Sequence, residues 1–241
     1  MKKFIVILAA VVIAATVWAT NQVTSINVAG YVKATLNRGQ YSMLRYDFFM
    51  MDGSPTVSNI FGSQLPVGSK VFRWTGSGYA TEEFKIKIGP PPTFLNLGTN
   101  WTPGTNHLDL GAGFWAYVPP SAPQATYTLN LMGEVPNNPT STIPIVGSYN
   151  LIGYSYPTDI MWKDTALAQN AAVGDKVFFW NGGGYDSSEF KIKIGPPPTF
   201  LNLGTNWTGV GTSYVVRVGN GFWFQATSGR NWTETRPYNL D

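Results

Sequence analysis

Short stretches in which apolar and polar residues alternate occur in both halves of the chain. The stretch from Phe84 to Ile88 reads Phe-Lys-Ile-Lys-Ile, which places three apolar side chains on one face and Lys85 and Lys87 on the other. The same two-residue period returns at residues 127–131. This period is typical of β-strands, so the pattern predicts a protein built mainly from strands.

Glycine-rich turns separate these predicted strands. Residues 70–74 precede a Thr-Gly-Ser-Gly turn at 75–78 and then Tyr79, which predicts a β-hairpin. Short aromatic strands are expected at 114–118 and 222–224, each after a Gly-x-Gly sequence. Only two segments, residues 164–170 and 58–61, favour a short helix. The pattern therefore predicts an all-β sandwich or barrel-like architecture.

The chain contains a long internal repeat. The twenty residues Glu83–Thr102 recur unchanged as Glu189–Thr208, at an offset of 106, and weaker similarity continues on both sides. A repeat of this length is too long for a solenoid unit and suits a small domain. We therefore predict two tandem, homologous β modules, residues 20–135 and 136–241, which meet at the proline- and asparagine-rich segment 135–139.

The first nineteen residues have the features of an export signal. Lysines at positions 2 and 3 precede an apolar run from Phe4 to Ala19, and Val17-Trp18-Ala19 suits cleavage after Ala19. A secreted or cell-surface protein without membrane insertion after cleavage is expected. An uncleaved membrane anchor is the weaker alternative, because a spanning helix needs about 20 apolar residues.

Charge and composition exclude several classes of function. The chain has 241 residues with 16 Lys and Arg against 13 Asp and Glu, no cysteine and one histidine. Loss of Lys2 and Lys3 with the signal leaves a nearly neutral chain, which argues against nucleic acid as a partner. Thiol chemistry, disulfide scaffolds and sites with two histidines are excluded by composition.

Several recurring motifs resemble a known group of proteins. Gly30-Tyr-Val32 is followed by the related stretches 68–79 and 174–185, and Gly-x-Gly-Phe-Trp occurs at 111–115 and 219–223. These motifs resemble secreted two-copy β proteins of planctomycete- and verrucomicrobium-type bacteria. The resemblance implies a secreted β fold and brings no catalytic residues with it. The Gly-Pro-Pro-Pro segments depart from the group's pattern.

No residue pattern predicts an enzyme, a cofactor or a metal site. His107 with Asp109 could be imagined in a hydrolase triad, but the second copy has no histidine there, so an exposed loop or strand-edge histidine is expected. Glu83 and Glu189 are duplicated acids in separate modules, whereas a glycosidase needs an asymmetric pair. Pairing of these glutamates with neighbouring lysines is the better interpretation.

The aromatic residues and prolines carry further expectations. Phe72, Trp74 and the Gly-Phe-Trp strands are expected in the core. Trp101 and Trp207 follow a polar Gly-Thr-Asn turn, so we expect them to be exposed. The prolines of 89–92 and 195–198 predict a stiff polyproline II arm.

The unchanged repeat carries the functional hypothesis. Core packing tolerates volume-conserving changes, so perfect identity indicates either a recent duplication or a surface that is needed twice. A self-assembling subunit of an extracellular filament, sheath or surface layer is expected, and a bivalent carbohydrate-binding surface protein is the alternative. Self-association, or an extracellular glycan, would then be the partner. The candidate contact residues are Lys85, Lys87, Pro91, Phe94 and Trp101, with Lys191, Lys193, Pro197, Phe200 and Trp207 in the second copy.

Overall fold

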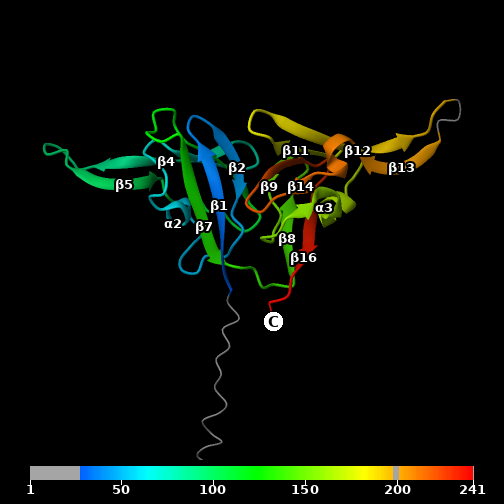
Figure 1. Ribbon diagram of the computed structural model, residues 1–241, viewed down its shortest axis with the longest axis horizontal. Coiled ribbons are helices and arrows are strands. Elements are labelled where there is room, and N and C mark those ends of the chain that lie inside the picture. Colours follow the sequence, from blue (N-terminus) through cyan, green and yellow to red (C-terminus); the bar gives the residue numbers. More distant parts are fainter. Residues whose placement is uncertain (1–27, 198–200, 241) are drawn as a thin grey trace, which may run out of the picture.

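The computed structural model describes residues 28–197 and 201–240 (Figure 1). The predicted export signal lies outside these residues, and so does Phe200. The prediction of an all-β protein is confirmed, because strands dominate and the helices are short. The strands are β1 (Ala29–Asn37), β2 (Tyr41–Arg45), β3 (Lys70–Trp74), β4 (Tyr79–Ile88), β5 (Asn96–Thr102), β6 (Gly113–Tyr117), β7 (Thr126–Glu134), β8 (Thr140–Ile145), β9 (Tyr149–Ile152), β10 (Ile160–Met161), β11 (Lys176–Trp180), β12 (Tyr185–Ile194), β13 (Asn202–Trp207), β14 (Val215–Val216), β15 (Phe222–Gln225) and β16 (Arg230–Thr235).

Short helical turns complete the chain. They are α2 (Val57–Phe61), α3 (Ala166–Gln169), η1 (Trp162–Asp164) and η2 (Gly209–Thr212). Of these, α2 and α3 lie where helix was expected, whereas η2 does not. The hydroxyl of Thr56 accepts the Asn59 N–H at the start of α2, and the hydroxyl of Thr165 accepts the Ala168 N–H at the start of α3. Such side-chain caps satisfy backbone donors that a helix leaves free at its N-terminus.

The two halves have the same sheet topology. The first half contains a five-stranded sheet in the order β2-β6-β3-β4-β5, and the second contains β9-β15-β11-β12-β13 in the equivalent order. Each sheet is covered on one face by a two-stranded sheet, β1 with β7 or β8 with β16, and all these pairs are antiparallel. The arrangements are sandwich-like, and within the described residues no sheet closes into a barrel.

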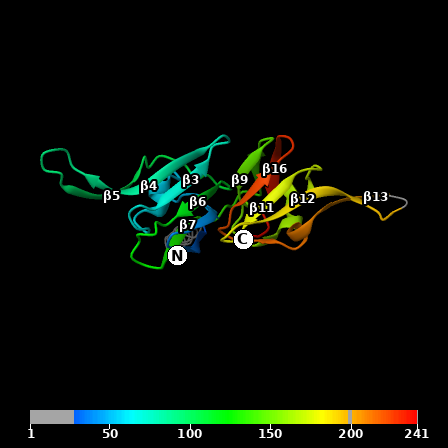
Figure 2. The ribbon, with the colours of Figure 1, turned by 90° about the horizontal axis from the view of Figure 1, so that it is seen from above.

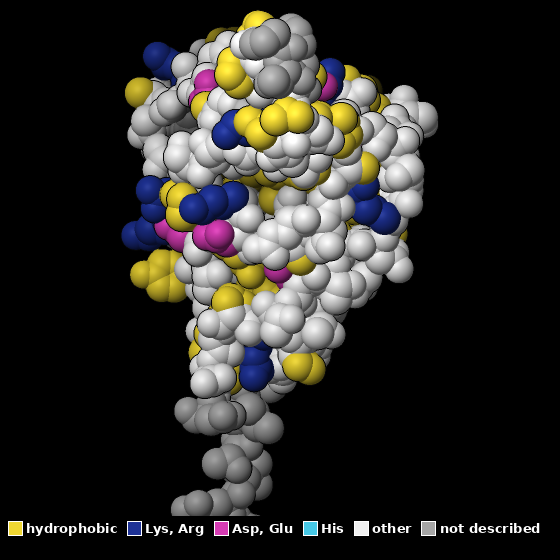
Figure 3. Space-filling view, turned by 90° about the vertical axis from the view of Figure 1, so that its right-hand side faces the viewer, with side chains coloured by type: hydrophobic (Ala, Val, Ile, Leu, Met, Phe, Trp, Pro, Cys, Tyr) yellow, Lys and Arg dark blue, Asp and Glu magenta, His cyan; other side chains and the backbone are white. Residues whose placement is uncertain are grey.

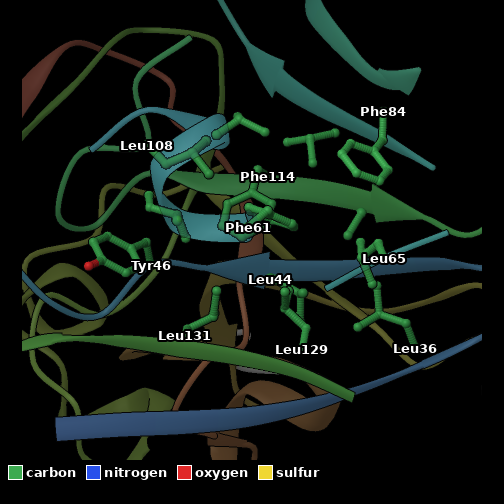
Figure 4. Packing of buried hydrophobic residues seen from close by; sticks show 14 of the residues in the cluster. Leu36, Leu44, Tyr46, Phe61, Leu65, Phe84, Leu108, Phe114, Leu129 and Leu131 are labelled. Atoms are coloured by element: carbon green, nitrogen blue, oxygen red, sulfur yellow. The ribbon is translucent and has the colours of Figure 1, made fainter. Parts of the chain in front are cut away.

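Each half has its own hydrophobic core. In the first half, the core lies between the five-stranded sheet and the β1–β7 pair, and α2 contributes Phe61 to it (Figure 4). Leu44, Phe114 and Leu129 from three different strands are buried there. Burial of each such side chain stabilises the fold by roughly 1.5–3 kcal/mol before entropy is subtracted. The second core is built around the buried Trp162.

The two halves lie side by side (Figure 2). Their contacts are reciprocal, so that an approximate two-fold relation connects the halves. The Arg45 N–H donates to the Gly219 carbonyl, and the equivalent Gly153 N–H donates to the Gly111 carbonyl, both at 2.9 Å. Both carbonyls belong to glycines with positive φ, +80° and +79°, so the turn that presents each carbonyl requires glycine. Equivalent backbone hydrogen bonds from both halves therefore hold this contact, which we call the joint.

Candidate interaction surfaces

The unchanged repeat forms two hairpin arms that project from the body. We call residues 85–100 the first arm and residues 191–206 the second arm, of which 191–197 and 201–206 are described. The arms are the outer parts of the β4–β5 and β12–β13 hairpins, and they point toward opposite ends of the long axis (Figure 1). The repeat is therefore a surface feature that the molecule presents twice.

The apolar side chains of the first arm are largely uncovered. The alternation predicted for Phe84–Ile88 is present in β4, but only Phe84 reaches the core. Ile88 is 62% exposed, and Phe94 and Leu95 near the tip are 63% and 61% exposed. Leu97 is also exposed. Monomeric proteins seldom leave so many large apolar side chains together in water, which marks the arm as a contact surface.

The second arm has the same character. Ile192, Ile194, Leu201 and Leu203 are all exposed. In a view onto this end of the molecule, hydrophobic side chains gather on the arm that faces the viewer (Figure 3). The same apolar surface is thus presented at each end.

The tip of the first arm is a closed turn. The Gly89 N–H donates to the Leu95 carbonyl at 2.7 Å, and the Phe94 N–H donates to the Pro90 carbonyl at 3.4 Å. The prediction of an extended polyproline II arm at 89–92 is therefore wrong, because the chain must reverse here to close the hairpin. Pro91 lies in this turn and is exposed. The equivalent bond from Gly195 to Leu201 is present in the second arm, where Pro197 is exposed.

The lysines of the arms contribute little binding energy by themselves. Lys85 pairs with Glu83 at 3.1 Å, and Lys191 pairs with Glu189 at 3.0 Å, which is the pairing expected from the sequence. Lys87 and Lys193 are exposed. Ion pairs at such exposed positions contribute about 0–1 kcal/mol. The apolar side chains, rather than these charges, define the arms as contact surfaces.

The expectation that Trp101 and Trp207 are exposed is wrong. Trp101 is 2% exposed and donates its indole N–H to the Gly62 carbonyl at 2.8 Å. Trp207 is 5% exposed and donates its indole N–H to the Ala168 carbonyl at 3.0 Å. Trp101 pairs across the hairpin with the buried Phe84, so its side chain belongs to the inner face of the sheet. The polar turn that precedes each tryptophan belongs to the arm, and the strand enters the core directly after it.

A second surface lies between the outer faces of the two five-stranded sheets. Trp74 donates its indole N–H to the Tyr149 carbonyl at 2.9 Å, and the equivalent Trp180 donates to the Tyr41 carbonyl at 3.1 Å. The Trp74 ring packs edge-on against Trp223 with 5.2 Å between centroids. The equivalent rings of Trp115 and Trp180 also pack edge-on, with 5.1 Å between centroids. These reciprocal contacts fix the rings and join the two halves.

The open part of this joint is an aromatic groove with two pockets. One pocket, of about 390 Å³, is lined by Trp74, Tyr79, Tyr149, Phe178, Tyr185 and Trp223. The other, of about 330 Å³, is lined by the equivalent side chains Trp180, Tyr185, Tyr41, Phe72, Tyr79 and Trp115. All of these side chains together form what we call the aromatic groove. Both pockets use Tyr79 and Tyr185, which are 47% and 46% exposed.

The two central tyrosines are held by neighbouring rings. Tyr79 lies 5.2 Å from Trp74, and Tyr185 lies 5.2 Å from Trp180, both edge-on. Burial raises the pKa of both phenols above the ordinary value, although hydrogen bonds with the indoles of Trp115 and Trp223 lower it. Tyr79 lines the same pockets as Tyr185 and raises the pKa of that phenol further. Both tyrosines are therefore neutral at physiological pH.

Four groove residues are expected in the core from the sequence, namely Phe72, Trp74, Trp115 and Trp223, and the structure agrees only in part. Phe114 and Phe222 of the Gly-Phe-Trp strands are in the module cores, whereas Trp115 and Trp223 are buried in the joint. Phe72 and Trp74 are also in the joint and are only half-buried. Strand alternation distinguishes residues of the module core from residues of the joint, because Phe72 and Trp74 alternate with the core residue Val71.

The polar residues considered for chemistry form no reactive cluster. His107 is exposed and its backbone bridges to Thr56, as expected for a strand-edge histidine. Among the described residues, no group of three His, Asp or Glu side chains lies close enough to hold a metal ion. In the same part of the chain, no helix combines the length and apolar character needed to cross a membrane.

Comparison of the chain with models of protein families, with curated proteins and with solved structures finds no match. Its functional interpretation therefore depends on the geometry of the arms and the aromatic groove.

Proposed function

We propose that this protein is a non-catalytic, secreted structural subunit that assembles with copies of itself into an extracellular filament, sheath or surface layer. One observation carries the proposal: two arms of identical sequence, with exposed apolar side chains, project toward opposite ends of the molecule (Figure 2). A subunit that presents equal contact surfaces at both ends can add further subunits at each end.

The edges of the sheets support the same function. β5 and β13 are the outermost strands of the five-stranded sheets, and neither contains a charged residue. Soluble β proteins usually protect such edges with lysines or prolines, because an open edge can pair with another chain. The prolines of the arms lie in the tips, outside β5 and β13. The arms therefore combine an unprotected edge with exposed apolar side chains.

Carbohydrate binding by Trp101 and Trp207 has no such support. Rings that stack on sugars need an accessible face, and these two indoles are buried with their N–H groups bonded to backbone carbonyls. Self-assembly through the arms is the function that the accessible residues favour.

The test removes the apolar surface of the arms without touching the cores. In residues 20–241, Ile88, Leu95 and Leu97 and their equivalents Ile194, Leu201 and Leu203 are changed to Ser. All six side chains are more than half exposed, so the fold should be retained. The unaltered chain should form polymers in negative-stain electron microscopy, and the six-serine variant should remain monomeric in sedimentation.

A matched control changes exposed apolar residues outside the arms. Val67 and Val173 occupy equivalent positions in the two halves and are both exposed. The Val67→Ser/Val173→Ser variant should assemble like the unaltered chain. A monomeric unaltered chain at every concentration, or polymers from the six-serine variant, would refute the proposal.

A further inference from the structure

The aromatic groove is a formed but uncovered binding surface. Each of its two pockets is lined by six aromatic side chains and by no charged one. The indole N–H groups of Trp74 and Trp180 are bonded to backbone carbonyls across the joint, which fixes the walls of the groove. A partner that enters a groove of this kind loses little free energy to rearrangement of the site.

The lining of the aromatic groove and the sequence of the arms are the same in both halves. Every lining residue of one pocket has the same residue type at the equivalent position of the other. On the opposite face of the same strands, Arg73 corresponds to Phe179, and Glu82 corresponds to Ser188. These core-facing positions have changed, while the aromatic side chains that line the pockets and the residues of the arms have not.

The arm has the chemistry that this groove would accept. Residues 88–102 contain no charged side chain, and the tip exposes Pro91, Phe94 and Leu95. Proline and phenylalanine rings pack favourably on tryptophan and tyrosine rings, as in proteins that bind proline-rich segments in aromatic grooves. Since neither the groove lining nor residues 88–102 include a charged side chain, docking of the tip would leave no charge buried without a partner.

The number and position of the arms also match those of the pockets in the groove. Each chain presents two arms and, within the aromatic groove, two pockets, and one approximate two-fold relation connects the members of each pair. The arms point away from the joint along the long axis, so an arm cannot reach the groove of its own chain (Figure 2). The occupant must come from another molecule.

We infer that the arm of one copy docks into the aromatic groove of another copy. This inference rests on the proposed function and names the contact that produces the assembly. Because the arm and the groove are different surfaces, the contact is heterologous, and each subunit can donate two arms and accept two.

The first experiment mixes two variants with complementary defects. The groove variant is Tyr79→Ser/Tyr185→Ser, and the arm variant is the six-serine change described above. Each variant alone should lose polymer formation completely, because one lacks the acceptor and the other lacks the donor. An equimolar mixture should form complexes in sedimentation, since intact grooves then meet intact arms.

Three results would overturn the inference. If the groove variant alone forms polymers like the unaltered chain, the arms bind one another, and the proposed function survives without the arm–groove contact. If the groove variant still forms polymers and loses only the binding of cellohexaose, a neutral glucan probe, the groove is a sugar site. A mixture that stays monomeric also refutes the contact.

A second experiment does not depend on loss of assembly. The chain has no cysteine, so introduced thiols are the only ones present. Phe94→Cys chains mixed with Tyr79→Cys chains should form an interchain disulfide on mild oxidation, identified by peptide mass spectrometry. Its yield should exceed that of Phe94→Cys with Val67→Cys by on the order of tenfold, because docking raises the effective concentration of the two thiols. Equal yields would exclude the docked arrangement.

Discussion

At the scale of single residues, the joint contains one pair of equivalent positions at which the two halves need different side chains. Arg45 is buried, donates to the Tyr156 carbonyl at 3.1 Å and pairs with Asp47 at 2.8 Å. Burial raises the pKa of Asp47 to about 6, although Arg45 and the Gly219 N–H lower it. The residue equivalent to Arg45 in the second half is Gly153, and a Cβ atom there would lie 2.2 Å from Cδ of Arg45. Only one large side chain fits at this place.

The substitution Gly153→Ala should therefore destabilise the protein. The added methyl group meets the buried stem of Arg45, and overpacking of this kind costs about 1–3 kcal/mol. Gly183→Ala is the control, because a Cβ atom there meets nothing within 4 Å and its φ is ordinary. Urea unfolding should show the loss for Gly153→Ala and a change within about 0.5 kcal/mol for Gly183→Ala. Equal unfolding free energies for the two variants would contradict this account.

At the scale of elements, the β4–β5 hairpin has two parts with different roles. The alternation of β4 continues along the hairpin, with a register shift between Ile86 and Ile88, but the core ends at the pair formed by Phe84 and Trp101. Beyond this pair the same alternation continues into solvent, so Ile86 and Ile88 are exposed. Periodicity specifies which side chains share a face, whereas burial depends on what lies over that face.

The two parts of the hairpin should respond differently to truncation. Trp101→Ala removes a buried indole and should lower the unfolding free energy by about 3–5 kcal/mol. Phe94→Ala removes an exposed ring near the tip and should change the unfolding free energy by no more than about 0.5 kcal/mol. Phe94→Ala should weaken assembly instead, which sedimentation of the same samples would detect. A large loss of stability from Phe94→Ala would show that the tip packs on the body.

At the scale of the whole molecule, two separate cores are connected through a third cluster. The connecting cluster contains Met43, Trp115, Leu151 and Trp223, with residues from both halves. Half-buried aromatic residues, including Trp74 and Trp180, pack around it. Unfolding of one half would expose this cluster on the other, so the joint should couple the two halves.

Loss of the joint should uncouple the halves. The unaltered protein is expected to unfold in one calorimetric transition, because neither half retains the joint when the other unfolds. Trp74→Ala/Trp180→Ala removes the two reciprocal indole hydrogen bonds and their ring contacts, and should resolve two transitions, one for each core. A single unshifted transition in this variant would show that the joint does not couple the halves.

Strands such as β3, β4, β6, β7 and β15 could be predicted from the sequence, because alternation and turn chemistry are local properties. The hairpin of β3 and β4, with its glycine-rich turn, follows from alternation and turn chemistry within a dozen residues. A surface position was one of two explanations that the identity of the repeat left open, and the arms have that position, whereas Phe84 and Trp101 of the same repeat are buried. The conformation of residues 89–92 and the burial of Trp101 could not be predicted in this way. Closure of the hairpin and the covering helix α2 involve other parts of the chain.

By itself, the sequence determined that this is an all-β protein with a duplicated segment, because hydrophobic period, turn residues and repetition are all properties of neighbouring positions. Only the tertiary structure decided which aromatic residues enter a module core and which form the groove between modules. That choice depends on contacts between residues such as Trp74 and Tyr149, which lie 75 positions apart. It also decided that the repeat projects as two arms, because exposure depends on where each core ends in space.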